Sequence, residues 1–159
     1  MSVRADADTL RRIPIFADCD PVPLQVIAFA AERQHFVAGE KIIEEGGEGT
    51  SSYLILNGRA EIRSTHKTRA VALGHADPGA LLGDMAMVGS VPYAVTATAL
   101  TTVATARIDR VLFLRVADAY PDFGAAVFKA MVRRLDGSLQ ELNAVKDLLD
   151  SARSFTKKQ

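Results

Sequence analysis

The sequence predicts an α+β, mainly β fold: a β jelly roll flanked by N-terminal helices and a long C-terminal helix. Apolar residues follow a helical period up to about Gln34, alternate with a period of two from about Phe36 to Ile108, and become helical again after Asp109. Glycines recur throughout the middle zone, which is typical of short strands joined by tight turns. Strands this short need closure, so they predict a jelly roll or a small barrel.

All 159 residues are expected to form one domain, because 48% of them are hydrophobic and the chain is too short for two ordinary domains. Its zones are a helical segment over 1–35, the jelly roll over 36–108, helices over 109–152 and a tail over 153–159. Basic and acidic residues both number 19, so the formal net charge is zero. A chain without net charge has no global field to attract nucleic acid or acidic membranes, and we expect neither as a partner.

The cellular compartment is predicted from cysteine usage and from the absence of targeting features. The single cysteine, Cys19, cannot form an internal disulfide, and the amino terminus lacks the apolar core of a signal peptide. No run approaches the roughly 18 apolar residues of a membrane span. These features predict a cytoplasmic protein.

The amino-terminal zone contains the stretch "PVPLQVIAFAAERQ", which predicts a packing helix. Leu24, Ile27 and Ala31 fall on one helical face. Asp20 precedes Pro21 and is expected to cap the helix.

The carboxy-terminal zone predicts two helices. "RVLFLRVADAY" is expected to form a short helix that ends before Pro121, and a helix of about 30 residues begins near Asp122. Leu135, Leu139, Leu142 and Leu149 follow one another at spacings of four, three and seven, which predicts a coiled-coil seam. Lys146 falls at one further position of this seam. The seam forms either a homodimer or a contact with the protein's own barrel, and the two alternatives remain open.

Residues 81–100, "LLGDMAMVGSVPYAVTATAL", combine the features of an anion site. Gly83 followed by a helix-forming "DMAMV" turn would aim free backbone N–H groups at one point inside the barrel. A phosphate would repel the Asp84 carboxylate, which is instead suited to accept hydrogen bonds from ribose hydroxyls. The stretch therefore indicates a nucleotide, if it binds a ligand.

With this stretch in place, the sequence resembles the cyclic-nucleotide-binding domains of catabolite activator proteins, kinase regulatory subunits and cyclic-nucleotide-gated channels over about Leu10–Leu142. "LRRIPIFADCDPVPLQVIAFAAERQHFVAGEKIIEEG" and "GGEGTSSYLILNGRAEI" are similar to the family's amino-terminal helices and its first strands and turns. The resemblance implies a phosphate-binding cassette at "DPGALLGDMAMVGSVPYAVTATAL" and hinge and dimerisation helices after Asp109. It makes cyclic AMP or cyclic GMP the ligand to test, requires no other cofactor, and assigns ligand binding to Gly83, Asp84, Met85, Ala86, Tyr93 and Ala94.

Two cassette positions depart from the family. Asp84 stands where the family usually has the glutamate that binds the ribose 2′-hydroxyl, and Tyr93 stands where it has the arginine that pairs with the cyclic phosphate. Losing one partner of such a buried pair costs about 2–5 kcal/mol. A tyrosine hydroxyl returns about 0.5–1.5 kcal/mol. We therefore predict weak or undetectable binding, with Tyr93 as either an apolar plug or a ligand contact.

Other cations are candidates to replace the arginine. Four of them lie in or beside the predicted second strand and the loop after it: Arg59, Arg63, Lys67 and Arg69. We interpret them as charges on a solvated strand edge, and the alternative is that at least one side chain points inward. Arg133 and Arg134 on the long helix face either solvent or a ligand.

The sequence contains no constellation typical of catalysis. His35, His66 and His75 have no metal-ligand spacing with one another or with Cys19, so no metal site is expected. No nucleophile elbow or paired-carboxylate site is present either. We expect a non-catalytic protein.

In DNA-binding members of the family a helix-turn-helix domain follows the long helix, whereas here about ten residues follow Leu149. We therefore expect a stand-alone sensor or regulatory domain that acts as a homodimer or through an unknown protein partner. A ligand-binding sensor, a ligand-free interaction module and an enzyme are the three functions considered, and no residue pattern supports the enzyme.

Overall fold

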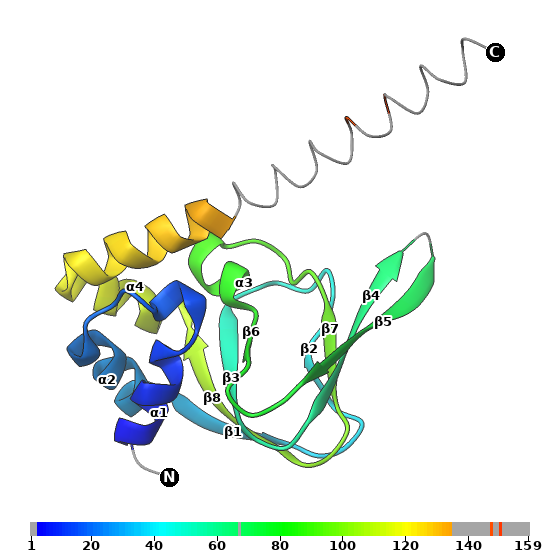
Figure 1. The fold of residues 1–159 in the computed structure, drawn as a ribbon. Helices are drawn as coiled ribbons and strands as arrows, with labels where there is room; N and C mark the ends of the chain where they lie inside the picture. Colours follow the sequence, from blue (N-terminus) through cyan, green and yellow to red (C-terminus); the bar gives the residue numbers. More distant parts are fainter. Residues whose placement is uncertain (1–2, 67, 135–146, 148–149, 151–159) are drawn as a thin grey trace.

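The computed structural model describes residues 3–66, 68–134, 147 and 150 (Figure 1). The chain begins with three short helices: α1 (Val3–Arg11), the 3₁₀ helix η1 (Pro14–Phe16) and α2 (Pro21–Ala30). One antiparallel sheet has the order β1-β8-β3-β6, with β1 (Glu32–Phe36), β8 (Val103–Asp109), β3 (Ser51–Asn57) and β6 (Leu81–Leu82). The other has the order β2-β7-β4-β5, with β2 (Lys41–Ile43), β7 (Thr96–Ala99), β4 (Ala60–His66) and β5 (Arg69–Ala76).

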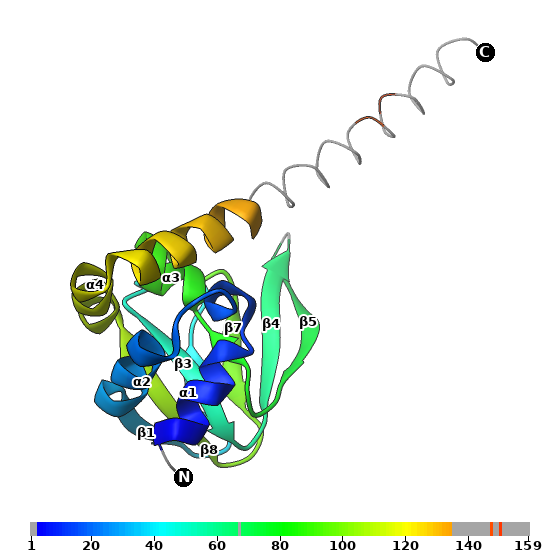
Figure 2. The ribbon, with the colours of Figure 1, turned by 60° about the vertical axis from the view of Figure 1, so that its left-hand side comes forward.

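These elements form three layers. Figures 1 and 2 show α1 and α2 lying over the sheet that contains β1, β3 and β8, while the β4–β5 hairpin lies on the far side of the molecule. Further helices complete the fold: α3 (Asp84–Gly89), which packs against β3, α4 (Arg110–Ala119) after the last strand, and a helix over residues 121–134. The predicted fold class is confirmed: the structure is an α+β, jelly-roll-like β-sandwich with helices at its termini.

The helix predicted around "PVPLQVIAFAAERQ" is confirmed as α2, with Leu24 and Ile27 buried. The predicted cap is wrong in one respect, because Asp20 occupies the N-cap position but its side chain accepts no hydrogen bond from the helix. An N-cap side chain bonds the second or third amide of the helix, and the third residue here, Pro23, has no N–H. Ala31 lies just past the helix, with an extended backbone.

The first strand begins earlier than the sequence predicts. β1 starts at Glu32 rather than at about Phe36, and Glu32 pairs with Arg107 of β8. The strand sequence "ERQHF" contains one buried residue, Phe36, and its other side chains are polar. It therefore shows none of the apolar alternation from which a strand is predicted.

The helices after the last strand follow the prediction as far as the structure describes them. The Asp109 carboxylate caps α4 by accepting a hydrogen bond from the Leu112 amide at 2.7 Å, and α4 ends before Pro121. Residues 121–134 are helical. The predicted seam residues lie outside the described residues: Leu135, Leu139, Leu142 and Leu149.

Two hydrophobic clusters lie on opposite faces of the sheet that contains β3. The first lies between this sheet and the helices, where the rings of Phe16 and Phe123 stack with centroids 6.1 Å apart. The second lies between the two sheets and includes Ile55 and Phe36. In the part of the chain that is described, no helix is long and apolar enough to cross a membrane.

Candidate functional site

The short helix α3 is where the sequence predicts it along the chain, and it packs against β3 and α4. Gly83 enters it with a φ of 79°, a conformation that glycine adopts without a steric penalty. A Cβ at this position would lie 2.7 Å from the Tyr93 ring, so the tyrosine packs directly against the Gly83 backbone. Ala86 and Met87 face the protein interior and are buried.

A cavity of about 400 Å³ lies beside α3. Its lining contains all six predicted ligand-binding residues: Gly83, Asp84, Met85, Ala86, Tyr93 and Ala94. Pro92 and Arg134 also line the cavity. The rest of the lining consists of aliphatic residues from neighbouring strands and loops: Ile43, Ile62, Leu81, Leu82, Val91 and Val95. The structure thus brings the predicted residues to one largely apolar cavity.

Tyr93 reaches into this region and is anchored there by backbone atoms. Its hydroxyl donates a hydrogen bond to the Ser51 carbonyl oxygen at 2.7 Å and accepts one from the Ser51 amide at 3.3 Å. Burial raises the pKa of the Tyr93 hydroxyl above its ordinary value, so the group stays neutral at neutral pH. Tyr93 therefore brings no positive charge to the cavity.

Asp84 is paired with an arginine from the long helix. One Asp84 carboxylate oxygen lies 2.5 Å from a guanidinium nitrogen of Arg134, and the other accepts a hydrogen bond from the Met85 amide at 2.8 Å. The Asp84 side chain is 16% exposed and that of Arg134 is 52% exposed. Of the two orientations considered for Arg134, the structure therefore shows the one toward the cavity.

Those of the remaining candidate cations that the structure describes lie at the surface. Arg59 pairs with Asp77 at 2.9 Å, Arg63 pairs with Glu61, and Arg69 is exposed. An inward orientation of these arginines is therefore wrong, because charged ends that make ion pairs in water gain nothing from entering an apolar interior. Arg133 lies 3.6 Å from the exposed Asp18, and Lys67 lies outside the described residues.

The sequence analysis missed Arg110, which holds α3 in place. Its guanidinium donates hydrogen bonds to the carbonyl oxygens of Gly49 at 2.9 Å, Ala86 at 2.5 Å and Met87 at 3.3 Å. It joins the loop before β3 to the C-terminal end of α3, where a positive charge is favourable. The sequence did contain a signal for a special role of Arg110, because this residue is the first of α4 and the N-terminal end of a helix disfavours positive charge.

The sequence analysis also missed Arg107 on β8. Arg107 stands opposite Tyr53 of β3, and residues opposite one another in antiparallel strands share a face, so Arg107 lies on the inner side of its sheet with Tyr53. It pairs with Glu32 at 3.3 Å. Although partial burial opposes the charge, Tyr53 and Glu32 raise the pKa of Arg107. Arg107 is thus a permanent cation already engaged by its own strand neighbours.

Within the described part of the chain, no three histidine, cysteine, aspartate or glutamate side chains gather closely enough to hold a metal ion. The buried thiol of Cys19 has its pKa raised to about 11, first by burial and then by the charges of Asp18 and Asp20. A thiol in this state is protonated at neutral pH and is a poor metal ligand or nucleophile.

The cavity and its cassette can be compared with known proteins. The family model described as "Cyclic nucleotide-binding domain" matches residues 33–120. A cAMP-dependent protein kinase regulatory subunit from Colletotrichum orbiculare is 31% identical over 109 residues, which cover 69% of this chain and 27% of the relative. The chain thus spans about a quarter of that relative's length.

Two solved structures share the fold over most of their length. A cyclic nucleotide-binding-like protein from Brucella abortus is 28% identical with a TM-score of 0.65, and the match covers 72% of this chain and 98% of that one. The N-terminal domain of a transcriptional regulator from Streptomyces coelicolor is 25% identical with a TM-score of 0.74, and the match covers 82% and 94%. Both matches therefore extend over nearly the whole of the solved chains.

Proposed function

We propose a function from the premise that the chain belongs to the cyclic nucleotide-binding domain family. In this proposal the chain is a non-catalytic regulatory domain. Its cassette lacks the phosphate-pairing arginine, and the domain therefore binds cyclic AMP and cyclic GMP weakly or not at all. Its regulatory fold and its likeness to kinase regulatory subunits support the regulatory role.

Tyr93 is the observation that carries this proposal. Its hydroxyl already donates its one hydrogen to the Ser51 carbonyl oxygen, so a phosphate oxygen could accept a hydrogen bond from it only if that bond were broken. The carboxylate available to a ribose, Asp84, is paired with Arg134. Both groups that would contact a cyclic nucleotide are thus engaged within the protein.

Calorimetric titration with cyclic AMP and cyclic GMP tests the proposal. We expect the wild type to bind neither at micromolar concentration, and Tyr93→Arg to bind at least tenfold more tightly, about 1.4 kcal/mol. Tyr93→Phe is the matched control, because it removes the hydroxyl without adding charge and should leave binding as weak as in the wild type. Micromolar binding by the wild type would overturn the proposal.

A second candidate function is supported by Arg134, which brings a cation to the edge of the cavity. If Arg134 left Asp84 for a phosphate, the domain would be a working cyclic-nucleotide sensor. Arg134→Gln would then weaken nucleotide binding by at least tenfold, about 1.4 kcal/mol, and Arg107→Gln provides the comparison for the other inner cation. Unchanged weak binding in both variants would exclude this sensor.

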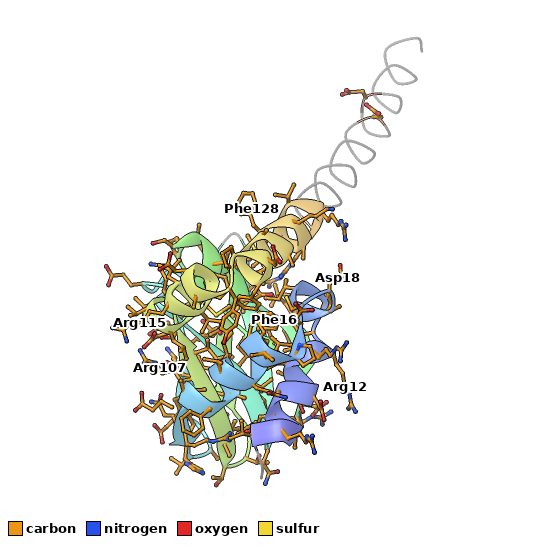
Figure 3. All side chains as sticks on the ribbon, turned by 90° about the vertical axis from the view of Figure 1, so that its left-hand side faces the viewer. Arg12, Phe16, Asp18, Arg107, Arg115 and Phe128 are labelled. Atoms are coloured by element: carbon orange, nitrogen blue, oxygen red, sulfur yellow. The ribbon has the colours of Figure 1, made fainter. Side chains whose placement is uncertain are left out.

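We also propose that the domain acts as a homodimer through its long helix. Phe128 and Val132 are 66% and 39% exposed, while Phe123, Val127 and Met131 of the same helix are buried. Figure 3 shows Phe128 projecting from the helix away from the body of the domain. In the sequence, Phe128 and Val132 precede Leu135 at spacings of four and three, so they extend the predicted seam toward the domain.

Sedimentation analysis of the full chain tests the dimer. Leu139→Asp combined with Leu142→Asp should reduce the mass in solution to that of a monomer, because each buried leucine contributes about 1.5–3 kcal/mol. Phe128→Ser should weaken the dimer, and Lys129→Ser, at an exposed neighbouring position, should not. An unchanged mass in the double variant would mean that the seam belongs to the protein's own core.

A further inference from the structure

We propose that the cavity beside α3 takes a small molecule with an apolar body and an ammonium head, which Asp84 binds in place of Arg134. This ligand class rests on the proposed function, in which the same cavity does not serve cyclic nucleotides. The inference follows from the chemistry of the cavity wall and from an asymmetry in its one ion pair.

The wall of the cavity suits an apolar body. Aliphatic side chains from both sheets line it, and the one aromatic residue in its lining, Tyr93, has its hydroxyl bonded to the Ser51 backbone. A volume of about 400 Å³ lies within the range of small-molecule sites, which are typically apolar with a few polar groups that fix orientation. Within this lining, the charged groups are Asp84 and Arg134.

The two members of this ion pair differ in their freedom to move. Asp84 is 16% exposed and is held on α3 by the Met85 amide, so its carboxylate stays in the wall. Arg134 is 52% exposed and sits at the end of a long side chain. An arginine can keep its stem on apolar surface and turn its head into water at small cost, whereas a fixed, mostly buried carboxylate needs a partner.

A neighbouring cavity gives Arg134 a place to go. This cavity of about 500 Å³ lies between η1 and the helix over residues 121–134, and its lining includes both Asp84 and Arg134. Asp18 also lines it and is 74% exposed. Arg133, which lines the same cavity, lies 3.6 Å from Asp18, so a displaced Arg134 would share that carboxylate with Arg133.

These features select the sign of the ligand's charge. An ammonium head can replace the guanidinium on Asp84 and leave the carboxylate paired. A carboxylate or phosphate head would have to draw Arg134 away and would leave Asp84 unpaired beside a second negative charge, which is costly at a buried site. A ligand with a hydroxyl head should bind with intermediate affinity, since a hydroxyl can donate a hydrogen bond to Asp84 but carries no charge.

Three indoles with the same apolar body test the proposal on the full chain: tryptamine with an ammonium head, tryptophol with a hydroxyl and indole-3-acetate with a carboxylate. The protein contains no tryptophan, so indole fluorescence reports the probe alone. Tryptamine should bind at least tenfold more tightly than tryptophol, and indole-3-acetate should bind most weakly. Equal binding of the three probes, or tightest binding of indole-3-acetate, would overturn the proposal.

Variants of the ion pair locate the effect. Asp84→Asn should abolish the preference for tryptamine over tryptophol, and Asp77→Asn, at an exposed ion pair with Arg59, should preserve it. Arg134→Gln should tighten tryptamine severalfold, because the internal competitor is gone, and it provides the test if Asp84→Asn does not fold. Weaker tryptamine binding by Arg134→Gln would contradict the exchange. Tight binding of cyclic AMP would instead overturn the proposed function, so the two failures are distinguishable.

Discussion

The two faces of the sheet that contains β3 are packed very differently. The face toward the helices is filled by large side chains, with the Phe123 ring in contact with both Phe16 and Phe113. The face toward the second sheet is packed against many small ones, among them the alanines at positions 60, 76, 97 and 99 of that second sheet, and it borders the cavity beside α3. Since buried apolar volume stabilises a fold and small residues leave room, we expect the helical face to contribute more to stability, while the inner face leaves room for the cavity.

The largest expected effect is on the helical face. Phe16→Ala should lower the free energy of unfolding by about 3–5 kcal/mol, because the fully buried ring would leave a cavity among other rings. Urea denaturation measures it. Phe29→Ala is the control, since Phe29 is 79% exposed and its loss should cost less than about 0.5 kcal/mol. Equal losses would contradict the assignment of this core.

Leu54 and Ile55 compare the two faces directly. They are neighbours on β3, both 0% exposed, and they belong to opposite clusters. Truncation of either to alanine should cost about 2–5 kcal/mol, with Leu54→Ala the more costly by roughly 1 kcal/mol, because the looser inner face can relax around the gap. Denaturation of both variants under identical conditions provides the measurement. The reverse order would mean that the inner face is the tighter one.

Arg110 connects the two faces through α3. Arg110→Met keeps the length of the side chain but removes a donor from the carbonyl groups of Gly49, Ala86 and Met87, so we expect a loss of about 1–3 kcal/mol. Hydrogen exchange should show faster exchange of the α3 amides. Arg59→Met, at an exposed ion pair, should change neither quantity. Unchanged exchange in Arg110→Met would show that α3 is held by packing alone.

Cys19 gives the helical face a dependence on pH. Burial keeps its thiol protonated in the folded protein up to about pH 11, while in the unfolded chain it ionises near its ordinary value of 9.0. The contribution to stability is therefore complete below pH 9.0 and is lost as the pH rises to about 11. Cys19→Ala should flatten this part of the stability profile. Parallel profiles for variant and wild type would show that the thiol does not contribute.

Much of the fold follows from local features of the sequence. The turn at Gly83 and the stop at Pro121 mark α3 and α4, because glycine and proline act on the backbone wherever they stand. The cassette residues from Gly83 to Ala94 are predicted largely from the resemblance to a family, and they line one cavity because they are close together in the chain. β1 was placed too late, because its polar residues are ordered by pairing with β8 and not by their own pattern.

The chemistry of the site depends more on distant pairing. Asp84 and Arg134 are 50 residues apart, and only the packing of the long helix near α3 brings them together. Arg110 and its carbonyl partners meet through a similar long-range contact, as do Tyr93 and Ser51. A sequence pattern names such residues as candidates but does not say which of them will neutralise one another.

The position of β8 has a consequence for how the protein is made. β8 pairs with β1 on one side and with β3 on the other, joining Glu32 to Arg107 and Ser51 to Asp109. The ribosome synthesises the chain from its amino end. β1, and the edge of β3 that pairs with β8, therefore cannot form these hydrogen bonds until residues 103–109 have been synthesised. Such non-local pairing slows folding and leaves strand edges exposed to other chains in the meantime. The sandwich therefore closes in a late step, when β8 inserts between two strands that the ribosome has already released.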